Sequence, residues 1–305
     1  MTDKVEPIQK VPAIRPGTYS DGHPLDDVQY VESKIILKAD RFTSRQSFFD
    51  FARLVKGVAR ECDVGFTSDG YEKDRPQIRE VVFLDTPDFR LYRNGFILRR
   101  RIPYQDGFPV GDPEIVFKMR GTDLQAAADT DMRPQIQGPY RIKFKAEVLP
   151  LKDQVGGVRV LYSHNCEFPL SHMHGADPSK MGTIAHGLPA LARLQRSKEE
   201  KVALVNHTIV EEVLQDVGTL DFGKGITAKA NVALWRERGD HTPLVGEFAY
   251  QVKFQKRDEL HSKAVKRSEQ FFVSLQFAAR DWVLLGATKT GIVYRSRGNP
   301  PQSHE

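Results

Sequence analysis

Alternation of apolar and charged residues is the main pattern of this chain, and it predicts β-strands with one apolar face. In the stretch 28–37, Glu32 and Lys34 share one strand face while apolar residues share the other. The same design recurs in four later stretches, at residues 96–102, 114–120, 141–148 and 245–254. Two more strands are expected, at 208–217 and 226–236.

The charged faces of so many strands could not pack against an apolar core without a large desolvation cost. A sheet that closes into a barrel avoids this cost, because its charged faces then line a wet channel and its apolar faces pack under helices. We therefore expect an α+β fold, an antiparallel barrel with helices packed outside it.

The helices expected outside the barrel have apolar stripes at three- and four-residue spacing. The first runs from about 44 to 60 and carries Phe48 and Phe51 on one side. The second is one long C-terminal helix over 257–285, which would span about 40 Å at about 1.5 Å per residue. Residues 150–190 are rich in Gly, His and Pro and indicate an elaborated loop, and residues 292–294 a short strand.

The segment 83–101, FLDTPDFRLYRNGFILRRR, is the most informative stretch. It predicts a strand, a short helix capped by Thr86, and a returning strand in which Arg99 and Arg101 share one face. Two guanidinium groups on one face suit a multiply charged anion, although a solvated strand face explains the pair equally well. Because Lys118, Lys143 and Lys145 take equivalent positions on other strands, the anion-binding reading is favoured.

Composition narrows the classes of function only modestly. The 45 basic and 40 acidic residues leave a net charge of +5, which does not by itself imply nucleic acid. Two cysteines exclude a disulfide framework and fit a reducing compartment. With neither an 18-residue apolar run nor a secretory signal in the sequence, we expect a cytoplasmic protein that does not enter a membrane.

The proline content of both ends suggests how the chain is divided. Residues 1–27 contain four prolines and few large apolar residues, which predicts a disordered N-terminal arm. Residues 28–296 form the expected barrel domain with its C-terminal helix, and residues 297–305 a frayed tail.

The segment 83–101 resembles the YYDTPDxxLxxxGxxLRxR motif of CYTH-domain proteins, the triphosphate tunnel metalloenzymes. The stretches VESKIILK, EIVFKMRG, KFKAEVL and GEFAYQVKF resemble further strands of that family, so the resemblance covers roughly residues 28–255. It implies an eight-stranded antiparallel tunnel and a metal-dependent hydrolase that cleaves a triphosphate, such as tripolyphosphate, a nucleoside triphosphate or thiamine triphosphate.

The resemblance also implies roles for individual residues. Glu32 and Lys34 would be catalytic. Magnesium or manganese would be held by three carboxylates, those of Glu32, Glu147 and Glu247. The triphosphate would be bound by a set of cations, namely Lys34, Arg99, Arg101, Lys118, Lys143, Lys145 and Lys229.

Several acidic positions of the family motifs are replaced in this chain. Tyr30 stands where the first glutamate of the opening strand belongs, and Leu149, Ala249 and Trp235 replace other carboxylates. Since hard divalent ions need oxygen ligands, these losses motivate an alternative, a degenerate protein that binds polyphosphate or a nucleotide without turnover. Nucleic acid is not expected as a partner, because the cations alternate with apolar residues instead of covering an outer surface.

Two further signals are interpreted as structural. A group of His and Cys residues could bind zinc or copper, but its spacing matches no common site; it consists of His164, Cys166, His172 and His174. GATKTG at 286–291 resembles a phosphate loop without its required neighbours, so Lys289 is expected in a surface turn.

Overall fold

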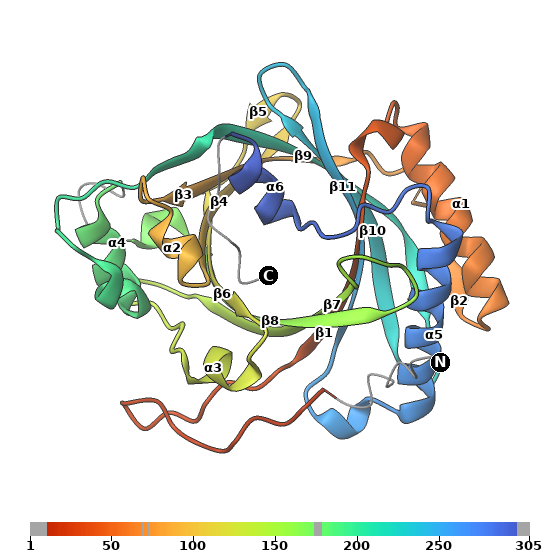
Figure 1. Ribbon diagram of the computed structural model, residues 1–305, viewed down its shortest axis with the longest axis horizontal. Coiled ribbons are helices and arrows are strands. Elements are labelled where there is room, and N and C mark those ends of the chain that lie inside the picture. The colour runs from red at the N-terminus through yellow and green to blue at the C-terminus, as the bar shows by residue number, and fades with distance from the viewer. Residues whose placement is uncertain (1–10, 69, 72, 174–178, 298–305) are drawn as a thin grey trace.

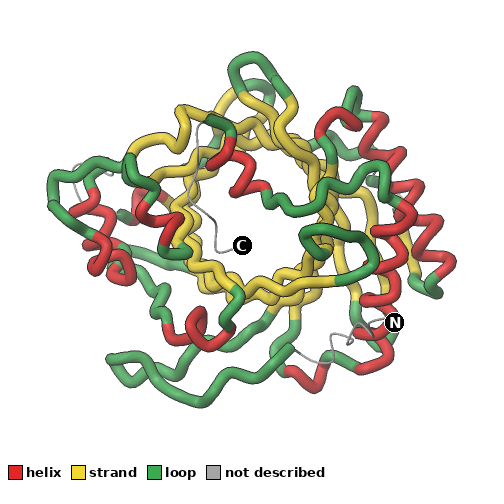
Figure 2. The backbone as a smooth tube through the Cα atoms, viewed as in Figure 1, coloured by secondary structure: helices red, strands yellow, loops and turns green. Residues whose placement is uncertain are grey.

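The computed structural model describes residues 11–297 except 69, 72 and 174–178. In this part of the chain nine strands close into a barrel, with a ring of strands inside and helices outside (Figures 1 and 2). Around the barrel the strands follow the order β10 (Thr227–Glu237), β11 (Pro243–Lys253), β1 (Tyr30–Leu37), β7 (Arg141–Pro150), β8 (Val158–Pro169), β6 (Glu114–Gly121), β4 (Phe96–Gln105), β3 (Gln77–Asp85) and β9 (Ala203–Asp221), and β9 pairs again with β10. Two short strands lie outside this path, β2 (Gly65–Thr67) on β9 and β5 (Phe108–Pro109) on β4.

The barrel with outer helices is confirmed, but the expected eight antiparallel strands are corrected in two respects. The structure has nine barrel strands, and β1 pairs with β7 in parallel. The additional strand is β8, which lies in the stretch 150–190 that we interpreted as a loop. The middle of its tunnel face carries Leu161, Ser163 and Asn165, and charges lie only near its two ends, so its sequence lacks the charge alternation that identified the other strands.

Helices α1 (Gln46–Glu61) and α5 (Ser262–Ala278) lie side by side over the outer face of β9, β10 and β11 (Figure 1). On the other side of the barrel, the outer apolar face of β4, β6 and β8 is covered by α4 (Met181–Gly187) and the 3₁₀ helix η3 (Pro189–Leu194). Shorter helices complete the wall, namely α2 (Arg90–Arg93), α3 (Leu124–Asp129), η1 (Ala39–Arg41), η2 (Leu170–His172) and η4 (Arg257–Glu259). None of the helices in the described residues has the length and apolarity needed to cross a membrane.

The C-terminal region differs from the single long helix expected over 257–285. The helix α5 ends at Ala278, and the chain then extends so that Val283 pairs with Leu37 at the end of β1. Trp282 packs against Phe42 and Phe51 there, which favours extension over further helix. The short strand expected at 292–294 is also wrong, because these residues belong to the helix α6 (Lys289–Arg295).

Helix α6 packs into one end of the barrel, which we call the α6 end. The Thr288 hydroxyl accepts a hydrogen bond from the Gly291 N–H and begins the helix. Val293 and Tyr294 are fully buried against inward-facing residues of six strands, among them Ile36, Phe83 and Trp235. The interior of the barrel is therefore apolar on one side of its α6 end.

The limits of the domain stay a prediction, and residues 1–10 and 298–305 lie outside the described residues. Residues 11–27 of the expected disordered arm do contact the barrel. Tyr19 is buried and donates a hydrogen bond to Asp26 at 3.1 Å, and Asp26 in turn lies 3.2 Å from the buried His164 of β8. These contacts give residues 11–27 a defined place on the wall.

We expect the outer apolar layer to dominate stability, and α5 provides a matched test. Phe271 is fully buried against Phe222 and Tyr250, whereas Phe277 on the same helix is 55% exposed. Phe271→Ala should lower the free energy of unfolding by about 3–5 kcal/mol, since it removes buried contacts and leaves a cavity. Phe277→Ala should cost less than half as much in urea denaturation, and equal costs would contradict this account of α5.

Candidate functional site

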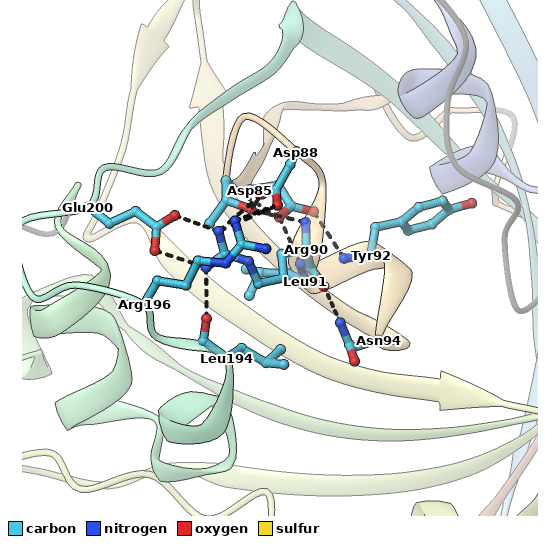
Figure 3. Close-up of polar contacts among 10 residues, drawn as sticks. Asp85, Asp88, Arg90, Leu91, Tyr92, Asn94, Leu194, Arg196 and Glu200 are labelled. Carbon is cyan, nitrogen blue, oxygen red and sulfur yellow. Dashed lines mark hydrogen bonds and ion pairs between the residues drawn. The ribbon is translucent and has the colours of Figure 1, made fainter.

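The segment 83–101 is organised by the buried carboxylate of Asp85 (Figure 3). Asp85 accepts hydrogen bonds from the backbone N–H groups of Thr86, Leu91 and Tyr92 at 2.7–3.0 Å. It also accepts one from the Tyr294 hydroxyl of α6 at 2.9 Å. Burial raises the pKa of Asp85, and these four donors oppose that rise. The carboxylate thus joins the turn before β4 to the helix inside the barrel.

Thr86 acts close to its predicted role as a cap, since its hydroxyl accepts a hydrogen bond from the Arg90 N–H at 3.0 Å. The buried Arg90 side chain reaches outward and binds the Glu200 carboxylate with both terminal nitrogens, at 2.6 and 2.9 Å (Figure 3). It also donates to the Leu194 carbonyl at 2.8 Å. This fork fixes α2 to η3, so Arg90 serves the wall of the barrel and not its interior.

Register and alternation place a dense set of charged side chains inside the barrel. The strand pairs align Glu32 with Glu147, Arg99 with Val116 and Lys143 with Asn165, all on the inner face. All of the predicted site residues belong to this strand face, namely Glu32, Lys34, Arg99, Arg101, Lys118, Lys143, Lys145, Glu147, Lys229 and Glu247. The same face adds cations that were not among the predicted site residues, namely Arg79, Arg120, Arg141 and Arg159.

The first cluster of charges is centred on Glu147 and Lys34. The Lys34 ammonium lies 2.9 Å from Glu32 and 3.2 Å from Glu147, and Lys118 lies 3.1 Å from Glu147. Burial alone would raise the pKa of Glu32, but Lys34 and Lys145 outweigh it and lower that pKa to about 2. Burial lowers the pKa of Lys118 to about 7 even though Glu147 opposes the shift. The cluster is thus rich in desolvated positive charge.

A second cluster lies towards the opposite end of the barrel. Glu167 forms ion pairs with Lys143 at 2.8 Å and with Arg141 at 2.5 Å. Arg141 also lies 3.6 Å from Glu114, which pairs with Arg101. Two neighbouring carboxylates therefore hold three cations here.

A third cluster contains Lys289, which is the first residue of α6 and not the surface turn that we expected. Its ammonium lies 2.8 Å from Glu247 and 3.2 Å from Glu212. The same ammonium lies over the Trp235 ring, 4.7 Å from the ring centroid. Glu212 also pairs with Arg79 at 2.5 Å and accepts the Trp235 indole N–H at 2.8 Å. No sequence signal pointed to Glu212, because its strand lacks clear alternation; the GATKTG stretch was the only hint of Lys289.

Arg99 differs from its neighbours because no carboxylate of the described residues contacts it directly, although Glu212 and Glu167 act on its charge from a distance. Among the described residues its side chain has no hydrogen bond or ion pair, and its buried Nε lacks a partner. Burial, together with the nearby charge of Arg101, lowers its pKa to about 9. Since a guanidinium stays protonated at neutral pH, Arg99 is a desolvated positive charge that is only partly compensated, by the carboxylates of Glu212 and Glu167.

Lys229 lies on the same strand face as Glu32, because both residues pair with Gln251 of β11. It is the most exposed of the predicted binding residues that form an ion pair in the described residues, since its side chain is 58% exposed and pairs with Asp216 at 2.7 Å. Its predicted role in anion binding stays a prediction.

The predicted metal ligands do not fit a magnesium or manganese ion in this arrangement. Such ions need several oxygen ligands, chiefly carboxylates and water. Lys34 occupies the place between Glu32 and Glu147 where a cation would bind, and Glu247 pairs with Lys289 instead. Among the described residues no three His, Cys, Asp or Glu side chains form a group that could hold a metal.

The alternative His and Cys group also fails to converge. His164 stacks on Phe144 and lies 3.0 Å from the Ala127 carbonyl, and Cys166 is buried in the outer apolar layer. His172 lies near the Pro139 carbonyl, and His174 lies outside the described residues.

Comparison with known proteins gave no matching family model and no matching curated sequence. Solved structures are similar at low identity. HpAC1 from Hippeastrum, a proposed adenylyl cyclase with a dominant triphosphatase activity, has 13% identity and a TM-score of 0.41, covering 88% of this chain and 96% of that one. PH1819 from Pyrococcus horikoshii OT3 has 15% identity and a TM-score of 0.34, covering 88% and 99%.

A proposed adenylate cyclase from Bacillus halodurans has 10% identity and a TM-score of 0.36, covering 86% of this chain and 95% of that one. TM-scores below 0.5 support no inference about what this chain does.

Loss of Asp85 should destabilise the fold through the turn and α6 together. Asp85→Ala leaves several buried N–H groups unpaired, at about 1–3 kcal/mol for each group. We expect a fall of at least about 2 kcal/mol in the free energy of unfolding. Asp88→Ala, in a 42% exposed carboxylate of the same turn, should cost less than about 1 kcal/mol in the same denaturation experiment. Similar losses in the two variants would refute the anchoring role of Asp85.

Removal of the unpaired charge of Arg99 should stabilise the protein when no anion is present. Arg99→Met keeps much of the side-chain volume and removes a buried charge, so the free energy of unfolding should rise by about 1–2 kcal/mol. The exposed, ion-paired Lys229 is the matched control, and Lys229→Met should change stability by less than about 0.5 kcal/mol. A loss of stability in Arg99→Met would show that Arg99 is compensated in the folded protein.

Proposed function

We propose that this protein binds a polyphosphate anion of the triphosphate kind inside the barrel. The observation that carries the proposal is Arg99, whose buried Nε has no hydrogen-bond partner and whose side chain forms no ion pair in the described residues. An uncompensated buried charge is costly, and a structure retains it where a ligand supplies the missing counter-charge. Arg99 faces the same interior as Lys118 and Arg101, so one multiply charged anion can reach all three.

The balance of charge inside the barrel supports the same ligand class. The inner-face cations Lys34, Arg79, Arg99, Arg101, Lys118, Arg120, Arg141, Lys143, Lys145, Arg159 and Lys289 outnumber the inner-face carboxylates Glu32, Glu114, Glu147, Glu167, Glu212 and Glu247. Several of these cations already share one carboxylate, as Lys34 and Lys118 share Glu147. Phosphate oxygens of a bound anion would neutralise the cations in excess of the carboxylates, because guanidinium and ammonium groups bind such oxygens through charge-assisted hydrogen bonds.

The ion pairs favour binding over metal-dependent hydrolysis, the reaction that the family resemblance implied. Hydrolysis by the expected route needs a divalent ion to activate water or to stabilise the leaving group. The Lys34 ammonium holds Glu32 and Glu147 in the place of such an ion. We therefore place the degenerate, polyphosphate-binding alternative first, with anion binding that does not require a divalent metal.

Calorimetric titration with tripolyphosphate in the presence of EDTA tests the proposal. We expect metal-independent binding that weakens as salt is raised, since screening reduces attraction between ligand and cations. Arg99→Met should weaken binding at least about tenfold, which corresponds to one lost charge-assisted contact. Lys229→Met should bind like the unchanged protein, within about twofold.

Absence of tripolyphosphate binding at low salt would contradict the proposal. Phosphate release from tripolyphosphate, ATP and thiamine triphosphate with magnesium or manganese distinguishes the two functions. Release above that of a Glu32→Ala variant would reinstate hydrolysis, whereas binding without release supports the function proposed here.

A further inference from the structure

Arg159 is a second inner-face arginine with unsatisfied nitrogens. It lies near the start of β8, on the same strand face as Ser163 and Glu167. In the described residues no hydrogen-bond partner exists for its Nε and Nη1, both of which are buried, and no ion pair compensates it. No family motif pointed to this residue, and it takes no part in the three clusters described above.

Arg159 lies at the α6 end of the barrel, because the turn that precedes β8 lies there. The turn that precedes β8 is fixed by the Gln276 side chain of α5, which accepts a hydrogen bond from the Gly156 N–H and donates one to the Gly157 carbonyl. The same turn approaches the segment before α6, because a Cβ on Gly286 would lie 3.1 Å from the Lys152 carbonyl oxygen.

The apolar packing of α6 does not cover the side of β6 and β8, where two arginines lie beside the buried Leu149 and Leu161. Val293 and Tyr294 pack on residues of β1, β3, β4, β9, β10 and β11. Figure 1 accordingly shows α6 near β9 and β11, across the barrel from β8. On the side of β6, β7 and β8, the inner face carries Arg120 and Arg159, and Arg120 lies 3.7 Å from Glu147. Cationic groups therefore continue past the Glu147 cluster towards the α6 end.

The length of this cationic line exceeds what a triphosphate needs. Along β8, Glu167 marks the second cluster and Arg159 lies eight residues away, a distance of about 26 Å at about 3.3 Å per residue. A triphosphate has only three phosphorus centres and covers a small part of that length. A linear polyphosphate has a repeating charge that can follow the whole line.

We propose that Arg159, supported by Arg120, is a subsite for an additional phosphate of a linear polyphosphate longer than a triphosphate. This inference rests on the proposed function and names its ligand more closely. The structural alternative, that Arg159 only stabilises the wall, is opposed by its unsatisfied nitrogens, since a buried structural guanidinium is normally fully paired.

Calorimetric titration with tripolyphosphate and with linear polyphosphates of increasing defined length tests the subsite. The unchanged protein should bind the longer chains about tenfold more tightly than tripolyphosphate, the gain from one added charge-assisted contact. Arg159→Met should bind tripolyphosphate with an affinity within about twofold of that of the unchanged protein. It should lose most of the gain in affinity that the unchanged protein shows for longer chains. The exposed Arg193 is the matched control, and Arg193→Met should keep the gain.

A second variant protects the test against an unfolding artefact. Arg159→Lys keeps the positive charge and should retain part of the gain with length, and thermal unfolding confirms that each variant is folded. A gain with length that persists in Arg159→Met, or no gain in the unchanged protein, would overturn the subsite while leaving the proposed function intact. Failure of the unchanged protein to bind tripolyphosphate or any longer chain would instead contradict the proposed function itself.

Discussion

The cost of burying charge is the constraint on which this structure depends. Most of the nine barrel strands turn charged side chains inward, so the barrel must compensate many ammonium and guanidinium groups with a smaller number of carboxylates. It does so by sharing, with Glu147 contacting Lys34, Lys118 and Arg120. Sharing leaves Arg99 and Arg159 without partners in the described residues, and these two side chains are where an anion would contribute most.

The interior is coupled to the outside of the barrel through the α6 end. Asp85 binds the turn before β4 and the Tyr294 hydroxyl of α6 with one carboxylate. Tyr294 also stacks on Tyr92 with ring centroids 4.0 Å apart. Because α6 begins with Lys289, the same helix that fills this end with apolar groups also brings a cation to Glu212 and Glu247. Packing of α6 and electrostatics of the interior therefore depend on each other.

Sequence reasoning identified the strands with strict alternation of apolar and charged residues. It failed for elements whose extent depends on contacts between distant parts of the chain. The faces of β1, β4, β6, β7 and β11 followed from period-two patterns, and the inward direction of Arg99, Lys118 and Lys143 followed with them. The strand β8 was missed because the middle of its inner face carries no charge, and its two inner-face charges, Arg159 and Glu167, lie eight residues apart. The end of α5 was missed because Trp282 packs between aromatic rings that come from distant parts of the chain. Lys289 joins the interior only through the packing of α6, and Glu212 lies on β9, whose sequence lacks clear alternation.

The sequence by itself determined that charged faces repeat from strand to strand and that cations survive better than acids among them. Local alternation is enough for this, because side chains on a strand point to opposite faces whatever the rest of the chain does. Only the tertiary structure decided which charges neutralise one another. The Lys34 ammonium takes the place between Glu32 and Glu147 that a metal would need, and Arg99 keeps no partner, because pairing depends on distances between strands that are far apart in the chain.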